Sequence, residues 1–173
     1  AASGGYYIAC NADRIFANNS TLTGSIGVFG IVPNTQKFLN KLGIYIDTVN
    51  THKYSDIANG YRRLSDDEYN IIQNSVEDIY QTFISHVAEG RSMSRTRVES
   101  IAQGRVWSGA DALSNGLIDK IGGLEDAIVS AADLAGLDDY RIITLPKKTD
   151  ILEEFIKSFS VKQNIVLPEF LGI

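Results

Sequence analysis

The chain has 173 residues, of which 44% are hydrophobic, and a formal net charge of −5. This length is sufficient for the core of one domain, and the acidic balance, with lysine and arginine scattered along the chain, argues against nucleic acid as a partner. Cys10 is the only cysteine and there are two histidines, so an internal disulfide is excluded and no cluster has the spacing of zinc ligands. We therefore expect no structural metal.

The sequence contains no run that approaches the roughly 20 apolar residues of a bilayer-spanning helix. It also opens without a methionine, directly in a motif of small residues at Ala1. We expect the chain to be part of a longer protein, with any membrane anchor in the upstream part.

The first half of the chain alternates helical and extended patterns. Gly4 and Gly5 lead into a short helix that starts at Tyr6, and Asn34 and Gly43 bound a second helix. The segments between are apolar and β-branched, as in buried strands. The expected elements are strands at 14–18, 24–32 and 44–49 and a helix at 34–41. This order predicts an α/β fold in which helices pack on a parallel or mixed sheet.

A long helix after Ser65 is the clearest local pattern. Ser65 and Glu68 form the sequence of a capping box, and an apolar stripe continues at steps of three and four until Gly90. We interpret this stripe as a face that packs on the core. Its members are Tyr69, Ile72, Val76, Ile79, Tyr80, Phe83 and Val87.

The second half of the chain continues the alternation. Ser94 caps a helix that reaches Gln103, and Gly116 ends a short helix between two extended pieces in the segment 104–119. The remaining expected elements are a helix at 124–134, a strand at 140–146, an amphipathic helix at 151–159 and a tail to residue 173.

Ser3 allows two interpretations from its local sequence. A serine before two glycines at a helix start is commonly a cap, but the same position also presents a nucleophile beside the free backbone N–H of Gly4. A serine hydroxyl is a weak nucleophile, so it needs a partner that takes its proton and donors that receive the developing oxyanion. The residues around Ser3 alone leave both interpretations open.

Three segments, in their order and spacing, carry a resemblance to a known family. They read AASGGYYIACNADRIFAN from Ala1, STLTGSIGV from Ser20 and GRVWSGADALSNGLIDKIGG from Gly104. Together they resemble the signal peptide peptidase A family, also called protease IV or the S49 serine peptidases. The resemblance extends from Ala1 to about Leu134.

The resemblance implies a fold related to Clp protease and crotonase and a catalytic serine–lysine dyad. It places the peptidase core at 1–145, with the N-terminal strands missing from this chain, and a C-terminal helix and tail at 146–173. Ser3 matches the nucleophile, and Gly4 matches a donor of the oxyanion hole. The strand that leads into Ser3 and the second oxyanion donor are expected upstream of Ala1, so this chain by itself is expected to have an incomplete site.

The general base has two candidate sources. Lys53 follows a predicted strand end, and one branch of the family has its base lysine in a similar segment. In the other branch, which has two tandem halves, the lysine comes from the N-terminal half, and Lys53 would then be a solvated cation. By the same resemblance Ser25 is a candidate for orienting the lysine, and its alternative is an ordinary strand-end hydroxyl.

Other titratable residues give weaker candidates. His52, with Asp47 or Asp56 as its orienting group, is a rival general base, although its neighbour Lys53 competes for the same position. We interpret His86 as an edge residue of the long helix and Cys10 as a small core residue rather than a reactive thiol.

The resemblance implies a serine endopeptidase that cleaves apolar peptides, such as released signal peptides, through an acyl-enzyme. It further implies a bacterial inner-membrane protein with its catalytic part on the extracytoplasmic side, and a homo-oligomer that also contacts the missing N-terminal part of its own chain. No metal or organic cofactor is required. Two alternatives remain: a non-catalytic half that supplies oligomer contacts or a peptide-binding groove, and acyl-CoA chemistry of the crotonase type.

Overall fold

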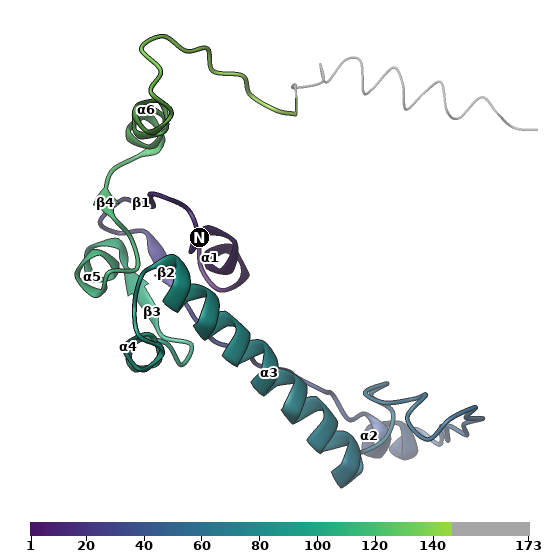
Figure 1. Cartoon of the computed structure of the whole chain (residues 1–173). Coiled ribbons are helices and arrows are strands. Elements are labelled where there is room, and N and C mark those ends of the chain that lie inside the picture. Colours follow the sequence, from purple (N-terminus) through teal and green to yellow (C-terminus); the bar gives the residue numbers. More distant parts are fainter. Residues whose placement is uncertain (147–173) are drawn as a thin grey trace, which may run out of the picture. The chain divides into compact units, whose positions relative to one another are not determined.

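The computed structural model describes residues 1–146 and contains short strands and helices of very different length (Figure 1). The chain divides into two compact units, Ala1–Ala135 and Gly136–Ile173, and the described part of the second unit has no helix or strand. The elements are α1 (Gly4–Ala9), β1 (Phe16–Ala17), β2 (Leu22–Gly24), α2 (Gln36–Lys41), α3 (Asp66–Gly90), α4 (Arg95–Ile101), β3 (Val106–Ser108), α5 (Gly109–Asn115), β4 (Lys120–Ile121) and α6 (Leu124–Ala135).

The strands form two small sheets. β1 pairs in parallel with β4, and β2 pairs antiparallel with β3. A parallel bridge between Ala2 and Gly24 continues the β2 edge toward the N-terminus. This mixture of helices and parallel and antiparallel pairs is consistent with the expected α/β class.

The predicted strands are longer than the observed ones. The strand expected at 24–32 ends at Gly24, and the segments 44–49 and 140–146 are not strands. A strand is stable only when a neighbouring strand takes its backbone hydrogen bonds. Residues 24–26 still bond to the chain at 104–106, but the described residues offer no such neighbour to 27–32, 44–49 or 140–146. The predictions for these three segments were therefore wrong about their state in this structure, although the segments are apolar as strands require.

Helix ends match the sequence closely. The Ser65 hydroxyl accepts from the backbone N–H of Glu68, and the Glu68 carboxylate accepts from the backbone N–H of Ser65, which completes the capping box of α3. The Ser94 hydroxyl accepts from the N–H of Arg97 at the start of α4, and Gly116 ends α5 in the left-handed conformation at φ 81°. The N-cap position of α2 is Thr35 rather than Asn34, a shift of one residue, although it is the Asn34 side chain that accepts from the N–H of Gln36, at 3.1 Å.

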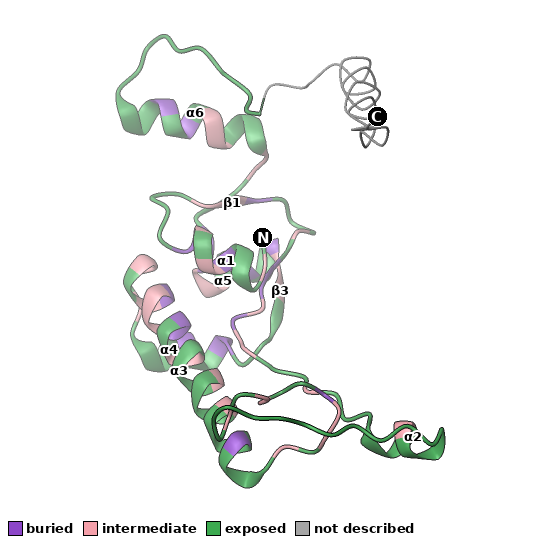
Figure 2. Ribbon diagram, turned by 90° about the vertical axis from the view of Figure 1, so that its right-hand side faces the viewer, coloured by how far each residue is buried: buried purple, intermediate pink, exposed green. Residues whose placement is uncertain are grey.

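The core joins one half of α3 to α1, α4 and α5. Figure 2 shows buried residues concentrated where these elements meet. The apolar stripe of α3 is buried at Phe83 and Val87, but Tyr69 and Ile79 are exposed, so the predicted core face was correct only for the C-terminal half of the helix. The buried apolar residues are Tyr6, Cys10, Ala17, Ile26, Phe83, Ile84, Val87, Val98, Ile101, Ala102, Ala112, Leu117 and Ile118.

The predicted amphipathic helix at 151–159 and the tail beyond it lie outside the described residues. The division into a peptidase core at 1–145 and a C-terminal segment stays a prediction. Within residues 1–146, no helix is both long enough and apolar enough to cross a membrane.

Candidate active site

Ser3 lies at the junction of a strand edge and a helix. Its backbone N–H donates to the carbonyl of Gly24 at 2.9 Å, and its own carbonyl accepts from the N–H of Tyr7 at 2.9 Å. The first bond ties Ser3 to β2 and the second belongs to the first turn of α1. The backbone of Ser3 is therefore held through both its N–H and its carbonyl, which fixes the position of its Cβ.

The backbone conformation of Ser3 prevents its side chain from capping the helix. Ser3 has φ 51° and ψ −123°, and no side-chain cap hydrogen bond forms. By contrast, Ser65, Ser94 and Ser108 cap α3, α4 and α5 with φ between −71° and −68°, and each hydroxyl accepts from the helix backbone. A positive φ costs a residue with a Cβ free energy, and such strain concentrates at functional sites. Ser3 thus keeps its hydroxyl free of every hydrogen bond within residues 1–146.

Aromatic residues hold α1 in place behind Ser3. Tyr6 is fully buried and donates its hydroxyl to the carbonyl of Leu117 at 2.7 Å. The ring of Tyr7 packs edge-on against the ring of Phe83, with centroids 5.0 Å apart. Burial raises the pKa of the Tyr6 phenol, so this hydrogen bond persists across the physiological range.

Gly4 supplies a first-turn backbone N–H next to Ser3. No hydrogen bond joins this N–H to another residue in the described part of the chain. A Cβ placed on Gly4 would meet no heavy atom within 4 Å, so the space beside it is open. Gly4 can therefore donate to an oxygen that approaches Ser3.

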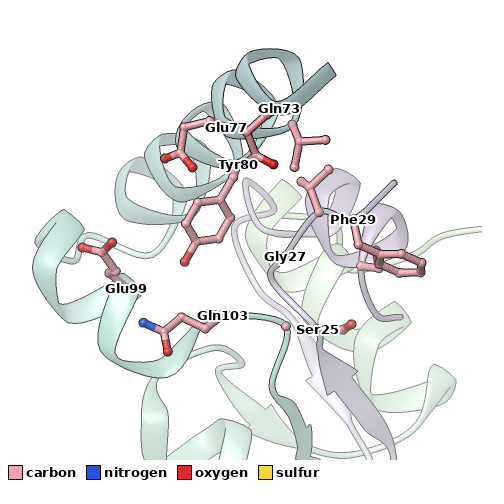
Figure 3. Close-up of a pocket in the computed structure, with 12 residues that line it drawn as sticks. Ser25, Gly27, Phe29, Gln73, Glu77, Tyr80, Glu99 and Gln103 are labelled. Carbon is pink, nitrogen blue, oxygen red and sulfur yellow. The ribbon is translucent and has the colours of Figure 1, made fainter. Parts of the chain in front are cut away.

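Ser3 and Ser25 line the same cavity. Its volume is about 520 Å³, and Figure 3 shows one wall from the segment after β2 and another from α3, α4 and the turn at Gln103. Cavities of this size accommodate small ligands or a few side chains of a peptide. The lining residues are Ser3, Ser25, Gly27, Val28, Phe29, Gln73, Val76, Glu77, Tyr80, Glu99, Gln103 and Gly104.

Ser25 also has an unusual backbone. Its φ is 50°, and its N–H donates to the carbonyl of Arg105 at 2.8 Å. No hydrogen bond of its hydroxyl is made within residues 1–146, so the Ser25 side chain remains free to bind a group in the cavity.

Lys53 is not among the residues that line this cavity. Its ammonium forms an exposed ion pair with Asp67 at 2.7 Å and lies 4.9 Å from the ring centroid of Tyr54. The hydrogen bond to Asp67 holds the pKa of Lys53 above its ordinary value, whereas a general base requires a neutral amine. Asp67 lies in the first turn of α3, and Tyr80 of the cavity wall lies roughly 20 Å further along the helix axis.

Comparison with known proteins now identifies the group to which this arrangement belongs. The family model "Peptidase family S49" matches residues 1–138. This chain belongs to peptidase family S49. The match contains Ser3, Ser25 and Lys53, and it confirms the resemblance drawn from the three sequence segments.

Relatives of this S49 chain carry protease names. It is 38% identical over 169 residues to "Protease 4" of Salmonella typhi, which is 98% of this chain and 27% of that protein. It is 41% identical over 141 residues to a putative protease of Synechocystis, 82% of this chain and 51% of the relative. It is 39% identical over 149 residues to "Putative signal peptide peptidase SppA" of Enterococcus faecium, 86% of this chain and 43% of that protein. The chain thus spans between about a quarter and a half of these relatives.

Among residues 1–146, no carboxylate hydrogen-bonds to His52, the rival general base of the S49 chain. Asp56 pairs with Arg62 at 2.8 Å, and Asp47 accepts from the backbone N–H of Thr48 at 2.9 Å. His86 packs edge-on against Tyr7, with centroids 5.2 Å apart, in agreement with an edge position on the long helix. A Ser-His-Asp arrangement is therefore not assembled by the described residues.

The sequence interpretation missed the wall that α3 contributes. Gln73, Val76, Glu77 and Tyr80 face the cavity, whereas the stripe containing Val76 and Tyr80 was assigned to the core. The signal was present in the spacing, because Gln73, Glu77 and Tyr80 follow one another at steps of four and three and so share one helix face. Polar residues in that face distinguish a cavity wall from a core face.

Proposed function

We propose that this chain carries the nucleophile of a serine peptidase that hydrolyses apolar peptides. The observation that supports this most directly is the free hydroxyl of Ser3, which lies on a strained backbone at a helix start and lines a cavity. Membership of family S49 and the protease names of the relatives support the same reaction class.

In the proposed reaction the Ser3 Oγ attacks the carbonyl carbon of the scissile peptide bond while a base takes its proton. The Gly4 N–H donates to the oxyanion that develops on the carbonyl oxygen. The C–N bond then breaks, the leaving amine takes the proton from the base, and an ester joins the acyl part of the substrate to Ser3. Water hydrolyses this ester and restores the Ser3 hydroxyl.

The base is proposed to be a lysine, with Lys53 as the candidate inside this chain. For this role Lys53 would have to leave Asp67, because the ion pair keeps its ammonium charged. Transfer into a site with less water would lower the pKa of the amine toward the working pH. Ser25 is proposed to orient the incoming amine, since its hydroxyl lines the cavity with Ser3.

The substrate is proposed to bind as an extended strand. The backbone of residues 27–32 forms no hydrogen bond with any other residue in the described part, and Val28 and Phe29 line the cavity. A peptide added along this segment would satisfy those backbone groups and place alternate side chains in pockets. Released signal peptides suit such an apolar site.

The setting of the reaction is also a proposal. We propose a Clp/crotonase-like fold, completed by the rest of the protein or by other copies of it in a homo-oligomer. The exposed apolar residues Phe29, Ile31 and Tyr45 support such completion. The bacterial relatives are compatible with the proposed position at the outer face of the inner membrane.

A test uses a serine-directed phosphonate and an apolar fluorogenic peptide on the full-length protein. We expect labelling at Ser3 and loss of hydrolysis by a factor of about 10³ or more in Ser3→Ala. Lys53→Ala should abolish both labelling and hydrolysis if Lys53 is the base, with a melting curve to verify folding. Lys41→Ala, which removes an exposed lysine of α2, is the matched control.

Two results would change the proposal. Persistent hydrolysis in Lys53→Ala would mean that the base lies outside these 173 residues. Labelling and hydrolysis that persist in Ser3→Ala would refute the nucleophile itself. A second candidate, a peptide-binding half without catalysis, is favoured by the pairing of Lys53 with Asp67, and it predicts peptide binding with no Ser3 labelling.

A further inference from the structure

The two walls of the Ser3 cavity differ in chemistry. Val28 and Phe29 make one wall apolar, while Glu77, Tyr80 and Glu99 make the other polar and acidic (Figure 3). A purely apolar substrate would make favourable contacts with the apolar wall only. The polar wall is therefore not explained by a preference for apolar substrates, and it indicates a further chemical feature of the substrate.

Tyr80 presents a polar group without a partner. Its hydroxyl oxygen is buried and forms no hydrogen bond with any residue of the described part. Figure 3 shows this hydroxyl directed toward α4, on the side of Glu99. A buried hydroxyl without a partner costs free energy, so a ligand group that enters the cavity and hydrogen-bonds to this oxygen would stabilise the complex.

The carboxylates near Tyr80 define the charge of that group. Within residues 1–146 neither Glu77 nor Glu99 forms an ion pair, and no lysine or arginine lines the cavity. Glu77 accepts a single side-chain hydrogen bond, from Gln81 at 2.7 Å. The neighbouring Arg105 donates to the Ser100 carbonyl and to Gln103, and it does not neutralise the wall.

We propose that this wall is a subsite for a basic side chain of the peptide substrate. The lysine ammonium or arginine guanidinium lies between Glu77 and Glu99 and donates a hydrogen bond to the Tyr80 hydroxyl, while the apolar wall holds a neighbouring apolar residue. The preferred substrate is then an apolar peptide with one basic residue near the scissile bond. This inference rests on the proposed peptidase function and narrows its substrate class.

The test compares matched peptides that differ only in lysine versus norleucine, with the substitution scanned across the positions on both sides of the scissile bond. Norleucine keeps the length of the side chain and removes the charge. At one position we expect kcat/KM for the lysine peptide to exceed that for norleucine by about tenfold, the factor that one charge-assisted hydrogen bond provides.

Variants of the full-length protein assign the preference to the wall. Glu99→Gln and Glu77→Gln should each lower the lysine-to-norleucine ratio of kcat/KM by roughly threefold or more. Tyr80→Phe should lower the ratio without lowering the melting temperature. The matched control is Glu89→Gln, an exposed glutamate of α3 that does not line the cavity.

Binding to the Ser3→Ala variant separates this inference from the catalytic proposal. Fluorescence anisotropy with the same labelled peptides measures recognition without cleavage. Tighter binding of the lysine peptide that Glu99→Gln removes would support the subsite even if no peptide were hydrolysed. Hydrolysis of the norleucine peptide with equal or weaker use of lysine at every position would overturn the subsite and leave the peptidase proposal standing.

Discussion

At the scale of single residues, backbone conformation decides what a serine does at a helix start. Ser65 and Ser108 have an extended backbone conformation, and each hydroxyl accepts a hydrogen bond from a backbone N–H in the first turn of the helix. Ser3 enters α1 at positive φ, and its hydroxyl forms no hydrogen bond with the first-turn N–H groups. A serine that directly precedes a helix is therefore a cap when its backbone is extended, and it is a candidate nucleophile when its φ is positive.

Glu68 is a second residue whose environment changes a measurable property, its pKa. It is buried at 2% exposure, pairs with Arg62 at 2.6 Å and accepts from the backbone of Ser65 at 2.8 Å. The hydrogen bonds from Arg62 lower the pKa of Glu68 from 4.5 to about 2. Arg62 also holds the pKa of Asp56 below its ordinary value.

We predict that Glu68 contributes to stability mainly above pH 4.5. The unfolded chain takes up a proton near the ordinary pKa of 4.5, whereas the folded chain does so only near 2, so the contribution is lost as the pH falls through this window. Urea unfolding as a function of pH should show Glu68→Gln less stable than the parent at pH 7, with the difference shrinking toward pH 2.

The control for this prediction is Glu89→Gln, which changes an exposed glutamate on the same helix. It should lower the stability at pH 7 less than Glu68→Gln does, because Glu89 forms no ion pair within residues 1–146. A Glu68→Gln variant with the parent's slope between pH 4.5 and pH 2 would show that the ion pair with Arg62 does not persist in solution.

At the scale of elements, α5 depends on a close approach to the chain after β1. Gly109, the first residue of α5, is buried, and a Cβ at this position would overlap the carbonyl oxygen of Asn18. The neighbouring N–H of Ala110 donates to the carbonyl of Asn19 at 3.2 Å, so the two segments cannot separate without losing that bond. A side chain at Gly109 therefore has no room.

We predict that Gly109→Ala lowers the free energy of unfolding by about 1–3 kcal/mol through overpacking. Chemical denaturation measures the difference. Gly123→Ala is the matched control, because the nearest heavy atom to its added Cβ would be 4.0 Å away, at Asp126. Equal stability of the two variants would show that α5 shifts freely relative to the Asn18 segment.

Elements defined by local chemistry were predictable from the sequence, and elements defined by remote partners were not. The capping box at Ser65 and the stop at Gly116 are encoded within a few residues and are present as predicted. The extended segments at 24–32 and 44–49 have strand composition, but a strand also requires a neighbour that lies elsewhere. Pattern alone could not supply that neighbour.

The residues of the candidate site also differ in how far the sequence predicts them. Ser3 and Ser25 are embedded in a recognisable motif, and the structure brings both to one cavity. The catalytic role of Lys53 stays a prediction. Its ion pair with Asp67 could not be predicted from the sequence, because no local pattern specifies a contact between these two residues. The predicted core position of Tyr80 holds in part, because its side chain packs against the core cluster, but helix periodicity did not predict that the same residue also lines the cavity.

At the scale of the whole molecule, the described unit Ala1–Ala135 leaves much apolar surface in water. The segment 28–49 contributes Phe29, Ile31 and Tyr45, all largely exposed, and Val49, which is 99% exposed. Exposed apolar surface of this extent is typical of protein contact sites.

We predict that the 173-residue chain self-associates at micromolar concentration. In sedimentation velocity its average mass should rise with concentration, and Val49→Asp combined with Tyr45→Ser should shift the rise to higher concentration, because a buried charge opposes association. Thr51→Asp, at an exposed polar position, is the control. A constant monomer mass for the parent chain at all concentrations would contradict the prediction.

Cys10 gives the molecule a built-in probe of motion near Ser3. It ends α1, is fully buried, and donates its thiol to the carbonyl of Tyr7 at 3.3 Å, while burial raises the pKa of the thiol. A small alkylating reagent can reach the sulfur only when α1 detaches from the core, so the rate of modification reports the opening frequency of that helix. Since no other cysteine exists in the sequence, one mass increment, timed with and without peptide, would show how firmly an occupied cavity locks the segment that carries Ser3.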